Sequence, residues 1–167
     1  HYFLISGGSG GSGKLGEAVT LLATHYRDRE DVEFIAICGK NEWIYRQMKK
    51  LFSHKVHMLR HTDRMAEYMR ACDAVITNPG GLSSTEAAVT GTALIFISPI
   101  PGGPETANVR FFERHGMAIY AETVALELTD LVQELLSQPV EVEQMARHQQ
   151  ETVNAHAAAD IVSFVES

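Results

Sequence analysis

The sequence predicts an α/β fold with a parallel sheet of about six strands and helices on both faces of the sheet. Short apolar runs alternate six times with longer segments of helical periodicity. Glycine, proline or polar residues follow most of the apolar runs, where a strand ends and a connection begins. A chain of 167 residues with 45% hydrophobic residues is long enough for one sizeable core, so we expect a single domain over residues 1–167.

The apolar runs and the helical patterns set the order of the expected elements. The expected strands span residues 2–6, 33–38, 55–59, 74–77, 93–97 and 117–120. The expected helices span residues 15–27, 41–51, 65–69, 82–90, 104–115, 123–138, 140–152 and 155–165. Residues 121–167 are therefore expected to form C-terminal helices with solvated acidic faces.

Local residue chemistry supports three of these elements. Trp43, Tyr45 and Met48 are apolar positions of one helix, and we expect them on the side that faces the sheet. Thr62 or Asp63 is expected to cap the helix that follows. Gly116 is expected to end the helix before the last strand, as a glycine just beyond a helix commonly does.

Residues 73–97 form the segment around which the rest of the chain is arranged. The strand at its start is ended by Pro79, Gly80 and Gly81, because proline cannot continue a ladder and glycine permits a tight turn. A short helix and a second strand follow. The segment therefore predicts one βαβ unit with a tight glycine turn.

The helix of this unit starts with residues that suit a phosphate and a sugar. Ser83, Ser84 and Thr85 lie in its first turn, where unpaired backbone N–H groups and the helix dipole favour an anion. The carboxylate of Glu86 could accept two hydrogen bonds from the vicinal hydroxyls of a ribose. The alternative is a tight turn followed by an exposed glutamate with no ligand.

The glycine-rich loop after the first strand allows three interpretations. Gly8, Gly10 and Gly13 have the spacing of the dinucleotide fingerprint, but no acid stands at the end of the second strand to hold a ribose. Gly8, Gly13 and Lys14 match the start of a Walker A loop, but Leu15 replaces the Ser or Thr that binds magnesium. The third interpretation is a loop that brings a phosphate or another chain segment close to the backbone. An NAD-dependent dehydrogenase or an NTPase remains an alternative class.

Four loops are expected to converge, because ligands of parallel sheets bind at the carboxyl ends of the strands. These loops span residues 7–14, 60–63, 78–81 and 101–108. In the last loop, Glu105 and Asn108 are three residues apart and can face the same crevice. The sequence therefore predicts one polar crevice at this edge of the sheet.

Charge and composition limit the classes of partner. The net charge of −7 argues against nucleic acid. Residues 46–64 are locally basic, and the alternative to a solvated surface is a face that meets anionic lipid headgroups. His54, His57 and His61 do not predict a metal site, since the outer two flank a strand and no fourth ligand has a matching spacing.

The cellular setting is predicted from the cysteines and the apolar runs. Two cysteines in apolar surroundings suggest a reducing compartment. The chain has no run of 18 apolar residues, so we expect a cytoplasmic protein with possible peripheral membrane contact. It opens on a strand without an initiator methionine, and we expect it to be part of a longer protein.

The order of four motifs resembles the C-terminal half of the diacylglycerol sugar transferases. These motifs are Gly7-Gly8-Ser9-x-Gly11, Cys38-Gly39-Lys40-Asn41, the run from Ala71 to Ala87 with its Asn78-Pro79-Gly80-Gly81 turn, and Pro101-Gly102-x-x-Glu105-x-x-Asn108. The family includes processive diacylglycerol glucosyltransferases and monogalactosyldiacylglycerol synthases, and the murein-precursor GlcNAc transferase is a more distant relative. The resemblance covers residues 3–120. It implies a Rossmann-like sheet that forms the C-terminal half of a GT-B fold and binds a UDP-sugar.

The resemblance implies a set of nucleotide-sugar-binding residues and their roles. The diphosphate would lie near the glycine loop at Gly8, Ser9 and Gly10 and near the turn and helix start at Gly80, Gly81, Ser83, Ser84 and Thr85. Glu86 would hold the ribose, and His61, Thr62 and Met65 would hold uracil. Glu105 and Asn108 would face the donor sugar or phosphate. The implied reaction is inverting hexosyl transfer to a lipid without a cofactor or a bound metal.

Two departures from the family qualify this expectation. Pro104 stands where the family has a glutamine before Glu105, and one extra residue lies beside it. The donor sugar is therefore left open. The family's acceptor half and catalytic base have no match in this chain, so the lipid acceptor would need an N-terminal domain or a separate subunit. The chain alone is expected to bind without transferring, and the alternative is a binding module with no transfer activity of its own.

Overall fold

A computed structural model describes residues 1–8, 14–97 and 103–166, and its sheet confirms the predicted fold class. The described strands form one six-stranded sheet in the order β3-β2-β1-β4-β5-β6, and every neighbouring pair is parallel. The strands are β1 (Tyr2–Ser6), β2 (Glu33–Ile37), β3 (Val56–Leu59), β4 (Ala74–Thr77), β5 (Ala93–Ile97) and β6 (Ile119–Ala121). The helices are α1 (Leu15–His25), α2 (Glu42–Phe52), α3 (Met65–Ala71), α4 (Gly81–Thr90), α5 (Pro104–Arg114), α6 (Val124–Ser137), α7 (Pro139–Thr152) and α8 (Ala157–Glu166).

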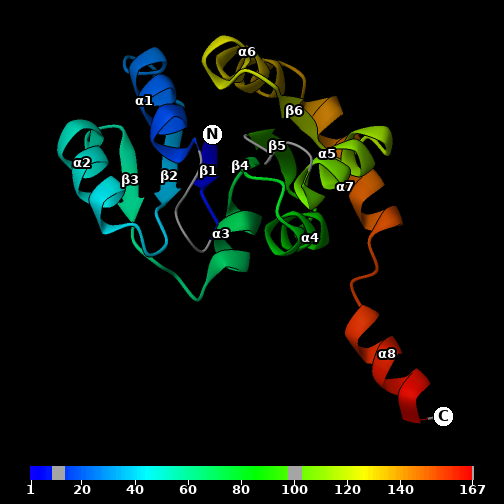
Figure 1. The fold of residues 1–167 in the computed structure, drawn as a ribbon. Coiled ribbons are helices and arrows are strands. Elements are labelled where there is room, and N and C mark those ends of the chain that lie inside the picture. Colours follow the sequence, from blue (N-terminus) through cyan, green and yellow to red (C-terminus); the bar gives the residue numbers. More distant parts are fainter. Residues whose placement is uncertain (9–13, 98–102, 167) are drawn as a thin grey trace.

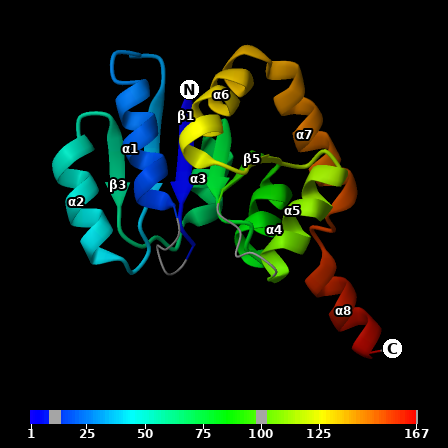
Figure 2. The same ribbon diagram turned by 45° about the horizontal axis from the view of Figure 1, so that its top comes forward.

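Helices cover both faces of the sheet (Figures 1 and 2). On one face α1 packs against α2 and α6, and on the other α3 packs against α4, which also contacts α7. The last helix, α8, buries none of its residues and projects away from the sheet in both views. Within the described ranges, no helix combines the length and the apolar composition needed to cross a bilayer.

The central strands are buried because helices lie above and below them. Every residue of β4 and β5 is buried, and so is β1 from Phe3 to Ser6. Strands that are covered on both faces show continuous apolar runs and no alternation. This explains why the short apolar runs of the sequence located the strands within a residue or two.

The expected orientation of α2 was right for two of its three apolar residues and wrong for Trp43. Tyr45 is buried and Met48 packs against the core, whereas Trp43 is 70% exposed. Trp43 and Tyr45 are two residues apart, so they point to different sides of a helix. The stripe that includes Tyr45, Met48 and Phe52 faces the core and leaves Trp43 on the outer side.

The two predicted helix ends had different outcomes. Gly116 has φ 64° and follows α5, and Met117 N–H donates to Phe112 O at 2.8 Å, as predicted for a glycine-ended helix. The N-cap of α3, however, is Arg64 and not Thr62 or Asp63. The Thr62 hydroxyl instead accepts a hydrogen bond from Arg64 N–H at 3.0 Å, which stabilises the turn one step before the helix.

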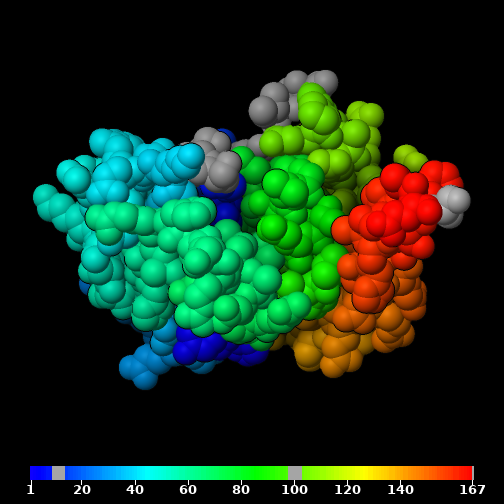
Figure 3. Space-filling model, turned by 90° about the horizontal axis from the view of Figure 1, so that it is seen from below, coloured from blue at the N-terminus to red at the C-terminus, as the bar shows by residue number. Residues whose placement is uncertain are grey.

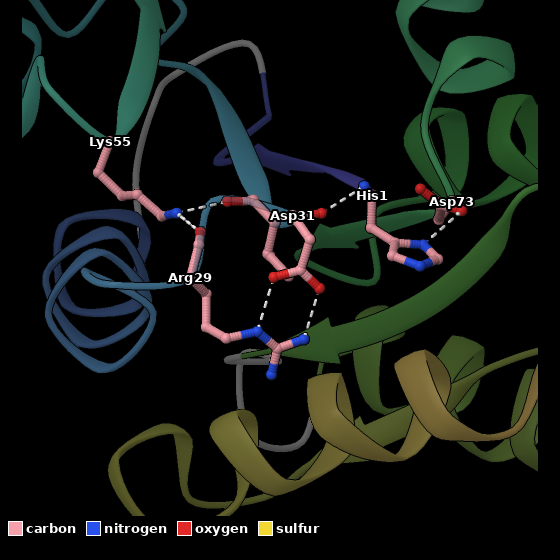
Figure 4. Close-up of polar contacts among 6 residues, drawn as sticks. His1, Arg29, Asp31, Lys55 and Asp73 are labelled. Atoms are coloured by element: carbon pink, nitrogen blue, oxygen red, sulfur yellow. Dashed lines mark hydrogen bonds and ion pairs between the residues drawn. The ribbon is translucent and has the colours of Figure 1, made fainter.

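Polar contacts tie the strands together at the amino edge of the sheet (Figure 4). The Lys55 ammonium donates to Val32 O at 2.5 Å and to Arg29 O. Arg29 forms two hydrogen bonds of 2.7 Å with Asp31, and this bonding lowers the pKa of Asp31 to about 2. The N-terminal amine donates to Asp31 O at 2.6 Å. The segments before β1, β2 and β3 are thereby fixed to one another.

The helix α7 secures the starts of β5 and β6 through one buried side chain. Gln149 is fully buried, and its Nε2 donates to Thr92 O at 3.0 Å and to Met117 O at 2.8 Å. Both acceptors are backbone carbonyls that precede a strand. A helix that follows the last strand therefore stabilises the sheet itself.

These two hydrogen bonds of Gln149, the Gln149 clamp, lead to a stability prediction. Gln149→Leu should lower the free energy of unfolding by about 1–3 kcal/mol, because two buried carbonyls lose their donor. Denaturant unfolding measures the change. The matched control is Gln150→Leu at the exposed neighbouring position, for which we expect a change within about 0.5 kcal/mol. Equal effects of the two substitutions would show that the clamp contributes nothing specific.

Candidate functional site

A cleft of about 470 Å³ opens at the carboxyl edge of the sheet. Its lining includes eight of the predicted site residues: Gly8, His61, Thr62, Met65, Gly80, Gly81, Ser83 and Glu86. They come from three loops and two helix starts that are far apart in the sequence. Three of the four loops that were predicted to converge thus contribute to the cleft, while the described residues of the fourth, Gly103 to Asn108, do not line it.

The sheet order explains why the cleft lies where it does. Ser6, at the end of β1, pairs with Ile37 of β2 on one side and with Thr77 of β4 on the other. The strand order reverses at β1, so the connections leave to opposite faces and a crevice remains between them. Seen from below, the blue end of the N-terminal strand shows between the cyan and green parts of the surface (Figure 3).

The start of α4 presents backbone to the cleft. Gly80 is the N-cap and has no side chain to pair with the first turn of the helix. By helix geometry, the N–H groups of Gly81, Leu82 and Ser83 have no partner within the helix. A Cβ atom added to Gly80 or Gly81 would meet no atom of the described residues within 4 Å. This wall of the cleft therefore offers N–H groups and the positive end of a helix dipole to an anion.

The side chains of α4 divide between structure and the cleft. Ser84 Oγ donates to Gly80 O and Thr85 Oγ1 donates to Gly81 O, each at 2.7 Å, and neither residue lines the cleft. Ser83 and Glu86 do line it, because residues three apart lie on the same side of a helix. The carboxylate of Glu86 is exposed and close to the start of α4.

The wall formed by His61 and Thr62 is held in place by the neighbouring strand and helix. Gly39 N–H donates to Arg60 O at 2.9 Å, so the loops after β2 and β3 are joined. The Arg60 guanidinium lies 3.9 Å from the ring centroid of Tyr45 and bonds Glu42 at 2.9 and 3.0 Å. Hydrogen bonds from Arg60, and then from Arg46, lower the pKa of Glu42 to about 2. The contact is therefore an ion pair at any pH near neutral.

The loop after β1 is described only at its start. Gly8 has φ 71°, a left-handed conformation that glycine adopts without strain, and its N–H donates to Ser6 Oγ at 3.4 Å. The predicted residues Ser9 and Gly10 lie outside the described residues.

The two predicted residues of α5 are not in the cleft lining. Asn108 Nδ2 donates to Pro79 O at 2.8 Å, so its amide holds the turn between β4 and α4. Glu105 lies one turn earlier and is partly buried. Asn108 is therefore placed to position Gly80 and Gly81, a contact that the sequence did not suggest.

Four residues of the cleft were missed by the sequence analysis: Ser6, Ile37, Gly39 and Leu82. Ser6, Ile37 and Gly39 lie at the end of a strand or just beyond it, which is the signal that could have found them, and Leu82 lies in the first turn of α4. Beside them, Thr77 Oγ1 and Asn78 Oδ1 are buried without a hydrogen-bond partner in the described part of the chain. Buried polar atoms are usually paired, so the end of β4 retains unused bonding capacity.

The strand order, the parallel pairing and the cleft at the carboxyl edge define a Rossmann-like ligand-binding domain. Comparison with known proteins gives the family. The chain belongs to the family described as the glycosyltransferase family 28 C-terminal domain, whose model matches residues 2–163.

A curated relative agrees with this family, and the structural neighbours share the fold. A processive diacylglycerol β-glucosyltransferase of Bacillus licheniformis is 32% identical over 123 residues, which cover 72% of this chain and 32% of the relative. The crystal structure of Acinetobacter baumannii MurG superposes with a TM-score of 0.79 at 22% identity, over 99% of this chain and 49% of that one. An S. aureus MnaA co-structure with UDP gives a TM-score of 0.78 at 14% identity, over 99% of this chain and 45% of MnaA. The fold is thus that of the C-terminal half of GT-B enzymes, and the chain spans about a third of the length of this curated relative.

The bond from Asn108 to Pro79 gives a prediction for the cleft wall. Asn108→Ala should lower the free energy of unfolding by about 1 kcal/mol, and Asn108→Asp, which has no donor, should do no better. The amides of Gly80 and Ser84, which donate to Asn78 O and Gly80 O in this turn, should exchange hydrogen faster in both variants, as mass spectrometry can measure. Arg110→Ala, at an exposed position of the same helix, is the control. Unchanged exchange at Gly80 and Ser84 would contradict the positioning role.

Proposed function

We propose that this chain is the UDP-sugar donor-binding half of an inverting glycosyltransferase that transfers a hexose to a lipid acceptor such as diacylglycerol. The observation that carries the proposal is that the open backbone of Gly80 and Gly81, the first turn of α4 and the Glu86 carboxylate face one cleft. Family membership supports it, as does the name of the B. licheniformis relative. The likeness to MnaA with UDP is consistent with the same ligand chemistry.

Each part of UDP has a matching part of the site in this proposal. The N–H groups at the start of α4 bind the diphosphate, and Glu86 accepts hydrogen bonds from the ribose hydroxyls. Uracil lies against the loop of His61 and Thr62, with Met65 behind it. The remaining proposed contacts are Gly8, Ser9 and Gly10 near the diphosphate, Ser84 and Thr85 through the backbone of the helix start, and Glu105 toward the donor sugar. Asn108 contributes by holding the turn at Pro79.

The proposed chemistry assigns leaving-group stabilisation to this half. An acceptor hydroxyl attacks the anomeric carbon as the bond to the UDP oxygen breaks, and negative charge builds up on the departing diphosphate. The dipole and N–H groups of α4 are aimed at that charge. A base outside this chain takes the proton of the hydroxyl. The chain alone binds the donor without transferring, and it uses no cofactor or metal.

A second candidate is a UDP-sugar-binding module or subunit that has no transfer activity of its own. The presence of Pro104 in the segment where the family has glutamine favours it. Transfer by the full-length protein with any UDP-hexose would eliminate this candidate.

Calorimetric titration with UDP, beside ATP and NADH, tests the proposed ligand. We expect saturable binding of UDP only. Glu86→Ala should weaken UDP binding at least about tenfold, because hydrogen bonds to a charged group are lost. The control is Glu143→Ala, which removes an exposed helical carboxylate outside the cleft and should leave the affinity unchanged.

A second ligand separates the ribose contact from a general effect of charge. The native chain should prefer UDP to 2′-deoxy-UDP, and Glu86→Ala should bind the two with nearly equal affinity. A preference that survives the substitution would refute the ribose role of Glu86. If the native chain binds no UDP, repeating the titration with the full-length protein tells a site that needs its other half from a site that has lost the donor.

The substitution Gly81→Ala tests whether Gly81 is required for the ligand to approach or for the stability of the fold. Alanine is the better helix former, by up to roughly 1 kcal/mol in a helix interior, and its Cβ meets no atom of the described residues at this first position of α4. We therefore expect an unchanged or higher melting temperature together with weaker UDP binding, measured by calorimetry. Full UDP affinity in this variant would mean that the ligand does not approach the start of α4.

A further inference from the structure

The outer side of α2 exposes large apolar side chains. Trp43, the one tryptophan of the chain, is 70% exposed, and Leu51 is 56% exposed. The two residues are eight apart and therefore lie on the same side of the helix. In Figures 1 and 2, α2 lies at the periphery of the molecule beside α1.

An apolar groove of about 460 Å³ runs beside Trp43 between α1 and α2. Leu21, Met48 and Ala125 contribute to it, and Thr20 Oγ1 lies 3.8 Å from Met48 Sδ where the two helices meet. The carboxylate that reaches the groove, Glu17, is paired with Lys14 at 2.7 Å. The groove thus joins the exposed tryptophan to a larger apolar surface.

The same helix also exposes three basic side chains. Arg46, Lys49 and Lys50 are exposed on α2, against the single acid Glu42. Glu42 is engaged by Arg46 at 2.8 Å and by Arg60 at 2.9 Å. The helix therefore carries a net charge of +2, from three bases and one acid, in a protein whose net charge is −7.

We propose that this surface, the outer side of α2 with its groove against α1, docks onto a membrane that contains anionic lipids. Tryptophan is favoured at the boundary between headgroups and acyl chains, and lysine and arginine interact with anionic headgroups. A helix with both is typical of interfacial binding. The positive charge of α2 favours an anionic lipid surface over a neutral one. The proposal is independent of the nucleotide, because none of these residues lines the cleft.

The geometry gives this docking a consequence for the cleft. The helix α2 begins just after Gly39, which lines the cleft at the carboxyl edge of the sheet. Trp43 lies in the first turn of α2. A membrane that receives Trp43 therefore lies close to the edge of the sheet on which the cleft opens.

Trp43 is the single tryptophan of the chain, so its fluorescence reports on this surface without an added label. Vesicles of phosphatidylcholine with about 30% phosphatidylglycerol should shift the Trp43 emission to shorter wavelength and protect it from acrylamide. Pure phosphatidylcholine vesicles should cause little change, and added salt should reverse the effect by screening. An emission spectrum that anionic vesicles leave unchanged would overturn the proposal and leave this surface to a protein partner.

Vesicle flotation of four variants identifies the surface. Lys50→Gln should weaken binding about fivefold, as expected for one basic residue near an anionic surface. Trp43→Ser should weaken it more. Phe164→Ser on α8 and Arg110→Gln on α5 are matched controls, because both native side chains are exposed on other helices. Normal binding by the first two variants, or equal losses in all four, would overturn the assignment to α2.

Discussion

The central position of β1 in the parallel sheet is the constraint on which the cleft depends. β1 pairs with β2 on one side and with β4 on the other, although β2 and β4 are separated by two helices and a strand along the chain. The connection from β1 leads to one face and that from β4 to the other. Neither helix can then cover the carboxyl end of the sheet between these strands, and the loops around it face one space.

The two edges of the sheet use their polar groups differently. At the amino edge, Arg29, Asp31 and Lys55 are bonded to one another or to backbone, so those segments are fixed within the chain. At the carboxyl edge, Gly80 leaves the start of α4 without a side-chain cap, and Thr77 Oγ1 has no partner among the described residues. The segments at the amino edge are thus held together by their own polar groups, while the start of α4 at the carboxyl edge keeps N–H groups that a ligand can use.

Sequence reasoning reached the fold and the location of the cleft because both follow from local patterns. Buried strands give apolar runs, and the turn at Gly80 and Gly81 ends a strand whatever surrounds it. The outward side of α2 and the bond from Asn108 to Pro79 depend on how elements distant in sequence pack. The chemistry of Trp43 alone predicts a core residue. It is exposed because α2 packs on the core through Tyr45, Met48 and Phe52, which lie on another side of the helix. Likewise, the spacing of Glu105 and Asn108 predicts that both lie on one side of a helix, but it does not predict which group each side chain contacts.

Because Gln149 bonds the carbonyls before β5 and β6, the stable unit of this domain extends beyond its last strand and includes α7. The last described strand ends at Ala121, yet the segments that lead into β5 and β6 are held by hydrogen bonds from α7. A donor half exchanged between two glycosyltransferases would have to carry α7 with it. In the design of such a chimaera, the junction therefore belongs beyond Val153, because a junction after Ala121 would remove the support of β5 and β6.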